Sequence, residues 1–188
     1  MAARISILLT TLLLSGCGQS LGTYAVEAVR VTTDVPLLAE TAAHHRHFLE
    51  VRLASRSSLT ALADEIDGVY VDGDLCPIRN PNGVIAFGPF GDDGEDLRLP
   101  SAAPALRPSA EGEFHYRIYV PIANRAKQTT KPGQIELPTY DLRGTKRDLC
   151  LRLFAPGYNI IKSRSEAVRV PAGVISKALE AGLLDTPH

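Results

Sequence analysis

The amino-acid sequence predicts a mostly β domain that ends in one helix. Short stretches in which apolar and polar residues alternate recur along most of the chain. Gly, Pro, Asn and Asp residues, which favour turns, separate these stretches and indicate a series of short strands. One stretch near the C-terminus instead spaces its apolar residues three or four apart, which is the pattern of an amphipathic helix.

The clearest strands are expected at 47–54, 114–122 and 148–154, where the alternation is most regular. Pro121 cannot donate a hydrogen bond to a neighbouring strand, so it indicates either an edge strand or the end of a strand. The residues expected to share one face are His47, Leu49, Val51 and Leu53 in the first strand, Phe114, Tyr116, Ile118, Val120 and Ile122 in the second, and Leu149, Leu151 and Leu153 in the third.

Shorter strands are expected between these. Asp72-Gly73 is a hairpin-type dipeptide and predicts a turn between strands at 69–71 and 75–77. A second turn is expected at 80–83, where Asn and Gly surround Pro81. The remaining predicted strands are 24–31, 84–87, 97–99, 135–137, 159–162 and 167–170.

Two segments are expected to be helical. Residues 57–68 predict a short helix, although an extended edge is also compatible with this stretch. Residues 171–185 predict the stronger helix, with Pro171 in its first turn. Its apolar stripe, which we expect to dock on the same domain, consists of Val174, Ile175, Ala178, Leu179 and Leu183. Short strands with turns between them and one C-terminal helix predict a β-sandwich of immunoglobulin or transthyretin type.

Composition indicates one domain with a real core. The chain has 188 residues, of which 45% are hydrophobic, and a formal net charge of −1. Because Lys and Arg are not in excess, nucleic acid is not expected as a partner. We also find no nucleophile elbow, no zinc-protease motif and no glycine-rich phosphate loop, so the sequence favours a protein without catalytic activity and without a cofactor.

The N-terminus has the layout of an export signal. One positive charge, Arg4, precedes the apolar run 5–14, and the small residues Ser15 and Gly16 follow it. This run is about half of what a helix needs to cross a bilayer, so a permanent membrane span is not expected. An ordinary cleaved signal in which Cys17 is incidental is one interpretation of these residues.

The residues Leu14-Ser15-Gly16-Cys17 also resemble the lipobox of bacterial lipoproteins. The resemblance implies that the Cys17 thiol receives a diacylglyceryl group, that residues 1–16 are removed, and that the new amine is acylated, for example with palmitate. Residues 17–23 would then be a lipidated tether and 24–188 a single domain. Gly18 stands where that family places an inner-membrane retention aspartate, so the resemblance implies the outer membrane, with the domain facing the periplasm or the cell surface.

Two cysteines remain when Cys17 is set aside. In an exported protein Cys76 and Cys150 most simply form a disulfide. Two unpaired thiols or half of a metal site are the alternatives.

Two segments contain residue types that bind metals. His45 and His47 are two apart on a predicted strand, with His44 beside them, and could ligate Zn²⁺ or Cu²⁺. The alternative is a polar strand start with imidazoles facing solvent. The acidic stretch 91–96 could attract calcium, although its spacing differs from that of an EF-hand, and an exposed acidic loop is the alternative.

A basic stretch is the candidate partner-binding surface. If its loops converge at one end of the domain, they could hold an acidic protein surface, lipid headgroups or a cell-wall polymer. A merely soluble face is the alternative. The residues are Arg125, Lys127, Lys131, Arg143, Lys146 and Arg147.

These features favour a membrane-anchored module that binds another envelope protein or an incoming one. In plan the chain is similar to the small lipoproteins that act as immunity proteins against effectors of type VI or related secretion systems. That similarity implies an inhibitor of an effector directed at the periplasm. The alternatives are a structural part of an outer-membrane secretion or envelope complex, and a periplasmic metal-binding protein that uses His45 and His47.

Overall fold

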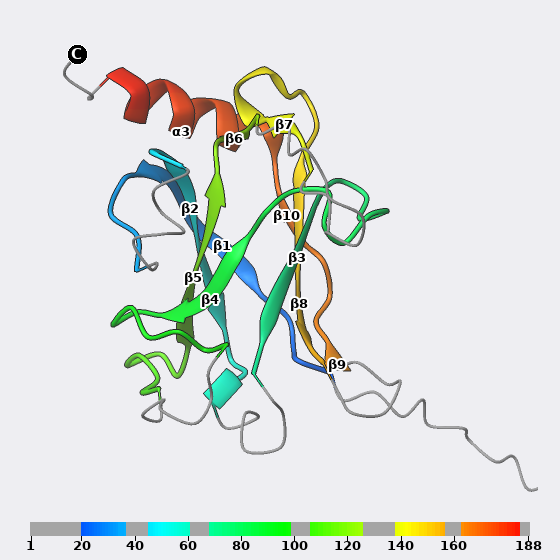
Figure 1. Ribbon diagram of the computed structural model, residues 1–188. Helices are drawn as coiled ribbons and strands as arrows, with labels where there is room; N and C mark the ends of the chain where they lie inside the picture. The colour runs from blue at the N-terminus through cyan, green and yellow to red at the C-terminus, as the bar shows by residue number, and fades with distance from the viewer. Residues whose placement is uncertain are drawn as a thin grey trace, which may run out of the picture.

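The computed structural model describes residues 20–36, 45–60, 68–98, 106–125, 138–156 and 163–184. Within these residues the chain forms two antiparallel sheets, a short two-stranded pair and a C-terminal α-helix (Figure 1). The prediction of a mostly β fold with a C-terminal helix is therefore confirmed.

The first sheet has the strand order β1-β2-β5-β4. Its bounds are β1 Ala25–Thr32, β2 Phe48–Ser55, β5 Phe114–Pro121 and β4 Phe87–Gly91. The two strands with the most regular alternation, β2 and β5, lie in the middle of this sheet and pair with each other over eight positions. Pro121 ends β5, which lies between two other strands, so it marks a strand end and not an edge.

The second sheet has the strand order β10-β8-β3, and β9 pairs with the far end of β8. Its bounds are β10 Val168–Val170, β8 Leu149–Ala155, β3 Tyr70–Leu75 and β9 Ser163–Arg164. Between β5 and β8 in sequence lie β6 Ala123–Asn124, β7 Tyr140–Asp141 and the 3-10 helix η2 Leu142–Gly144.

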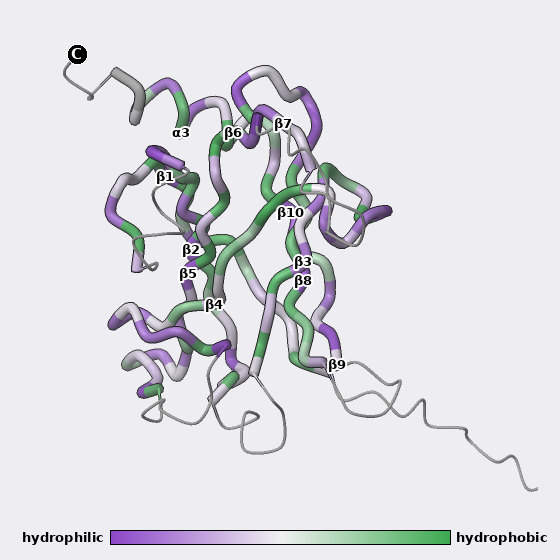
Figure 2. The backbone as a smooth tube through the Cα atoms, in the orientation of Figure 1, coloured by the Kyte–Doolittle hydropathy of each residue, from purple (hydrophilic) through white to green (hydrophobic). Residues whose placement is uncertain are grey.

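One hydrophobic core joins the two sheets. The predicted faces of β2, β5 and β8 all point into it, and Figure 2 shows the apolar residues concentrated along these strands. Because a two-residue period places alternate side chains on one face, these three patterns identified part of the core. The confirmed core residues are Leu49, Val51 and Leu53, then Tyr116, Ile118, Val120 and Ile122, then Leu149, Leu151 and Leu153.

The predicted turn at Asp72-Gly73 is wrong, because β3 runs through both residues without interruption. Gly73 pairs with Leu151 on one side. On its other side it donates to Pro81 O at 3.0 Å and accepts from Val84 N at 2.9 Å. A Cβ at position 73 would lie 2.7 Å from Val84 O, so glycine is needed here for a close backbone approach and not for a turn.

Other predicted boundaries shift. The strand expected at 84–87 begins only at Phe87 and continues to Gly91. The strand expected at 97–99 is absent at its described residues, because Leu97 and Arg98 form a turn. Residues 59–60 are helical as predicted, whereas 61–67 lie outside the described residues, as do the predicted strands at 135–137 and 159–162.

The C-terminal helix α3, Ala172–Leu184, docks on its own domain as predicted. Ile175, Ala178 and Leu179 are buried in the core. Val174 is 39% exposed and does not belong to the buried stripe. The side chain of Leu183 lies outside the described set. Among the described residues, no helix is both long enough and apolar enough to cross a membrane.

Candidate functional site

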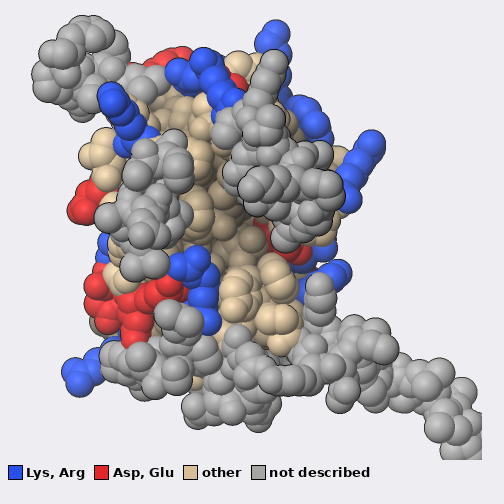
Figure 3. Space-filling view, viewed as in Figure 1, with Lys and Arg blue, Asp and Glu red and all other residues tan. Residues whose placement is uncertain are grey.

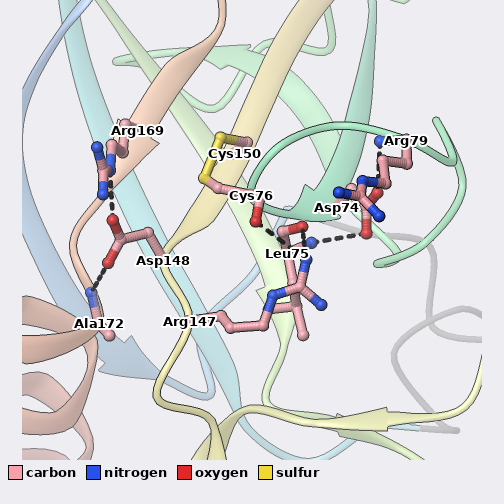
Figure 4. Close-up of a disulfide and its surroundings, with 9 residues drawn as sticks. All are labelled: Asp74, Leu75, Cys76, Arg79, Arg147, Asp148, Cys150, Arg169 and Ala172. Atoms are coloured by element: carbon pink, nitrogen blue, oxygen red, sulfur yellow. Dashed lines mark hydrogen bonds and ion pairs between the residues drawn. A yellow bond between two sulfur atoms is a disulfide. The ribbon is translucent and has the colours of Figure 1, made fainter.

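A disulfide joins the end of β3 to the start of β8 (Figure 4). Cys76 and Cys150 are 74 positions apart in sequence and 5.0 Å apart between their Cα atoms. The strand register aligns Leu75 with Leu149, and Cys76 N donates to Asp148 O at 2.8 Å. The predicted pairing is therefore confirmed. Since the sequence has three cysteines, Cys17 is the one that this disulfide leaves over.

Asp74 holds the loop that follows β3. Its carboxylate accepts hydrogen bonds from the backbone N–H groups of Leu75 at 2.7 Å, Arg79 at 2.8 Å and Asn80 at 3.0 Å. Partial burial works to raise the pKa of Asp74, but these N–H groups and the nearby Arg147 guanidinium hold it below its usual value. The carboxylate is therefore a rigid structural element beside the disulfide.

Asp148 connects the start of β8 to two other elements. Its carboxylate accepts a hydrogen bond from Ala172 N, at the start of α3, at 2.8 Å, and it forms an ion pair with Arg169 of β10. The backbone N–H of Ala172, helped by the Arg169 guanidinium, holds the pKa of Asp148 below its usual value.

Convergence of the two basic segments was only a condition for the candidate surface, and the structure places one arginine from each segment on the same carboxylate. Arg125 and Arg143 lie 2.6 and 2.7 Å from Asp141 Oδ2. Asp141 also caps η2, since it accepts the backbone N–H of Arg143 at 3.0 Å. Hydrogen bonds from the Arg143 side chain hold the pKa of Asp141 well below its usual range, and a hydrogen bond from Arg125 adds to this effect. Partial burial acts in the opposite direction but is outweighed.

Arg147 and Lys146 continue this surface toward the disulfide. Arg147 donates to Leu75 O at 2.5 Å and to Cys76 O at 3.0 Å, so its guanidinium lies against the end of β3. Lys146 is exposed. Lys127 and Lys131, the other two predicted members, lie outside the described residues.

We call this surface the basic end; it consists of the exposed residues Arg125, Arg143, Lys146, Arg147 and Arg169, together with Asp141 and Asp148. Five cations and two carboxylates leave three positive charges. Asp74 and Arg79 in the adjoining loop add one charge of each sign. Figure 3 shows Lys and Arg gathered at the upper end of the molecule, where Figure 1 places β6 and β7.

The two predicted histidine ligands both lie just before β2, which begins at Phe48, and not on the strand itself. His45 packs edge-on against the ring of Phe48, with 6.0 Å between the ring centroids. Nε2 of His47 is buried and has no hydrogen-bond partner among the described residues. His44 lies outside the described residues, and within those residues no group of three His, Cys, Asp or Glu side chains is arranged to hold a metal.

In the acidic loop after β4, two of the four carboxylates form ion pairs, those of Asp92 and Asp96. Asp92 lies 3.0 Å from Arg52 and 3.6 Å from Arg117, which are on neighbouring strands. Asp96 pairs with Arg98 at 2.5 Å. Figure 3 shows this loop as an acidic patch at the lower left, well separated from the basic end.

Sequence reasoning missed three residues of the basic end. Asp141 carries a local signal, because an aspartate two positions before Arg143 can accept its backbone N–H. Asp148 and Arg169 carry none, since only the register that pairs Arg169 with Cys150 places Arg169 beside Asp148.

Comparison with protein-family models, with curated proteins and with solved structures finds no match for this chain.

Proposed function

We propose that the protein is an envelope lipoprotein, anchored through Cys17, whose β domain binds another protein and has no catalytic role. The observation that carries this proposal is the Cys76–Cys150 disulfide. Such a bond is typical of proteins exported to an oxidising compartment. It also removes both partners that Cys17 could otherwise have within the chain, which favours lipidation of Cys17 at the lipobox-like Leu14-Ser15-Gly16-Cys17.

The anchor follows from the chemistry of that cysteine. One acyl chain gives only weak and reversible membrane binding, whereas two or three chains on one residue anchor a protein stably. Gly18 favours the outer membrane over the inner one, with the domain facing the periplasm or the cell surface. Two sheets around one core support the finer assignment to an immunoglobulin- or transthyretin-type sandwich.

The basic end is the surface that suits a partner. Its five cations are exposed, while the disulfide, Asp141 and Asp148 fix the backbone beneath them. A preorganised surface loses little entropy on binding, and clustered positive charge accelerates association with an acidic partner. We therefore propose an acidic, incoming effector as the partner and inhibition of that effector as the function.

The test first produces, in the periplasm of cells, the products of the genes that flank the gene of this protein, and it then uses the product that stops growth. Finding no such product would contradict the inhibitory role. The full-length wild type should protect growth, and the triple variant Arg143→Glu/Lys146→Glu/Arg147→Glu should lose protection, because it replaces three cations with three acids. The matched control Arg46→Glu/Arg107→Glu/Lys177→Glu makes the same charge change at exposed positions elsewhere and should protect normally. Equal protection by both triple variants, with both folded, would contradict the proposal.

A further inference from the structure

The chain joins the folded body directly after the proposed anchor. Ser20 forms a parallel bridge with Arg164 of β9, and Leu21 N donates to Arg164 O at 3.2 Å. Leu21 is 1% exposed, and the hydroxyl of Tyr24 donates to its carbonyl at 2.6 Å. The described chain is therefore attached to the domain from Ser20 onward.

This attachment limits how far the domain can lie from a lipid on Cys17. Three residue steps separate Cys17 from Ser20, and a fully extended chain covers at most about 11 Å in three steps. Figure 1 shows the first described residues beside β9, at the opposite end of the sheets from β6 and β7. If Cys17 is lipidated, as proposed above, the β9 end must lie at the membrane surface.

Two exposed arginines lie near the attached segment. Arg164 lies beside Ser20 in the bridge described above. Arg56 directly follows Ser55, whose hydroxyl donates to Thr23 O at 2.8 Å. Guanidinium groups bind phosphate oxygens well, and lipid headgroups present phosphates.

An aromatic pair lies next to Arg164. Phe154 pairs with Arg164 in the sheet register and stacks on Tyr70, with 5.7 Å between the ring centroids. Both rings are half-buried. Aromatic residues beside arginine are typical of surfaces at a membrane–water interface, where the ring contacts the lipid boundary and the polar atoms stay in water.

We infer that the β9 end of the domain, through Arg56, Arg164, Tyr70 and Phe154, contacts the headgroups of the membrane that carries the anchor. The segments 20–24, 55–57 and 163–166 contain two arginines, Arg56 and Arg164, and one acid, Glu166, so their net charge is positive. The strand β8 spans seven residues, Leu149 to Ala155, and carries the chain from the basic end to β9. At the usual strand rise this places the basic end about 20 Å farther from the membrane. With the β9 end at the membrane, the basic end faces the aqueous compartment and can bind only partners there.

The absence of tryptophan from the sequence makes a direct test possible. The full-length lipidated variants Tyr70→Trp and Lys146→Trp would each contain a single tryptophan and would be reconstituted in vesicles of brominated phosphatidylcholine and phosphatidylglycerol. The bromine quenches only tryptophan at the lipid boundary, so Tyr70→Trp should lose about half of its emission and Lys146→Trp little. Phe154→Trp serves as a second probe if Tyr70→Trp does not fold. Equal quenching at the two ends would overturn the inference.

A longer tether separates headgroup binding from a purely mechanical restraint. A Gly/Ser linker of about ten residues inserted after Gly18 removes the length limit. If the surface binds headgroups, quenching of Tyr70→Trp should persist in this variant and disappear when Arg56→Glu and Arg164→Glu are added. Loss of quenching on lengthening alone would overturn headgroup contact.

This inference rests on the proposed lipidation, and the two can fail separately. All variants would first be checked for incorporation of a palmitate analogue. A labelled protein without differential quenching overturns the surface contact and leaves the proposed anchor intact. An unlabelled protein overturns the proposed anchor, and the surface contact with it.

Discussion

Among the described residues, the carboxylate of Glu50 is hydrogen-bonded by one arginine, Arg30, which is exposed. Glu50 is 4% exposed, and Arg30, opposite it on β1, donates to both of its oxygens at 3.1 and 2.9 Å. A buried charge that loses its partner is costly, whereas an exposed ion pair contributes little. The burial of the partner carboxylate, more than the burial of the arginine itself, therefore determines what an arginine contributes to stability.

Arg30→Ala should lower the free energy of unfolding by about 2 kcal/mol, because it leaves the buried carboxylate of Glu50 with fewer hydrogen bonds. The matched control is Arg169→Ala. The side chain of Arg169 is 72% exposed and that of Arg30 is 65% exposed, so the two arginines are similar. Their partners differ, because the side chain of Asp148 is 17% exposed and that of Glu50 is 6% exposed. Urea unfolding at pH 7 measures both variants, and equal losses would contradict this account.

Asp74 should make stability dependent on acid. Its pKa is lowered in the folded protein, because the N–H groups of Leu75, Arg79 and Asn80 overcome the effect of burial. A lowered pKa contributes stability that is fully present above the unfolded value of about 4 and is lost as the pH falls through the folded value. Urea unfolding of the wild type and Asp74→Ala should therefore differ by about 2 kcal/mol at pH 7 and converge in strong acid. A difference that stayed constant at all pH values would contradict this origin.

At the scale of elements, α3 is held against β1 by a close contact. A Cβ at Gly182 would lie 2.4 Å from Cβ of Val31, a branched side chain that cannot move away easily. Gly173 is on the same helix and has nothing within 4 Å of the corresponding position. The two glycines thus differ in packing although both lie in one helix.

Gly182→Ala should lower the free energy of unfolding by about 2 kcal/mol and the thermal unfolding midpoint with it. The reason is that the overlap with Val31 outweighs the better helix propensity of alanine. Gly173→Ala should raise the free energy of unfolding by about 0.5 kcal/mol, and the midpoint slightly with it, because only the difference in helix propensity acts there. Circular dichroism melts measure both. Stabilisation by both substitutions would show that the helix does not lie as close to β1 as described.

The sequence was sufficient for elements whose own pattern decides their structure. Alternation identified the buried faces of β2, β5 and β8, and the spacing of Ile175, Ala178 and Leu179 identified the docked face of α3. It failed at Asp72-Gly73, where a dipeptide typical of turns is held in a strand by Leu151 on one side and by the segment 81–84 on the other. Such long-range pairing leaves no local signal.

The same division applies to the candidate site. The Cys76–Cys150 pair followed from the expected compartment and from the count of cysteines. The convergence of Arg125 and Arg143 was anticipated only as a condition, and Asp141, which joins them, was missed. Arg169 reaches the same end only because β10 pairs with β8 in one particular register.

At the scale of the whole molecule, the disulfide closes a separation of 74 residues and so limits the unfolded chain more than any single contact does. Cys76→Ser/Cys150→Ser should lower the free energy of unfolding by about 4 kcal/mol in the chain-entropy model. Urea unfolding of the oxidised wild type and of the double variant measures the difference. Reduced wild type should match the variant, and a difference near zero would contradict the role of the bond.

The disulfide, the basic end and the attachment of Ser20 to β9 describe a domain with two distinct ends. In the proposal developed above, one end carries the lipid and the other meets the partner. Both roles depend on Cys17, which the disulfide leaves over.

The most direct measurement is therefore labelling of growing cells with a clickable palmitate analogue, followed by electrophoresis of the full-length protein. The account predicts a labelled wild type and an unlabelled Cys17→Ser variant that accumulates with its signal still attached. A wild type that takes up no label, or a Cys17→Ser variant that takes up as much as the wild type, would contradict it.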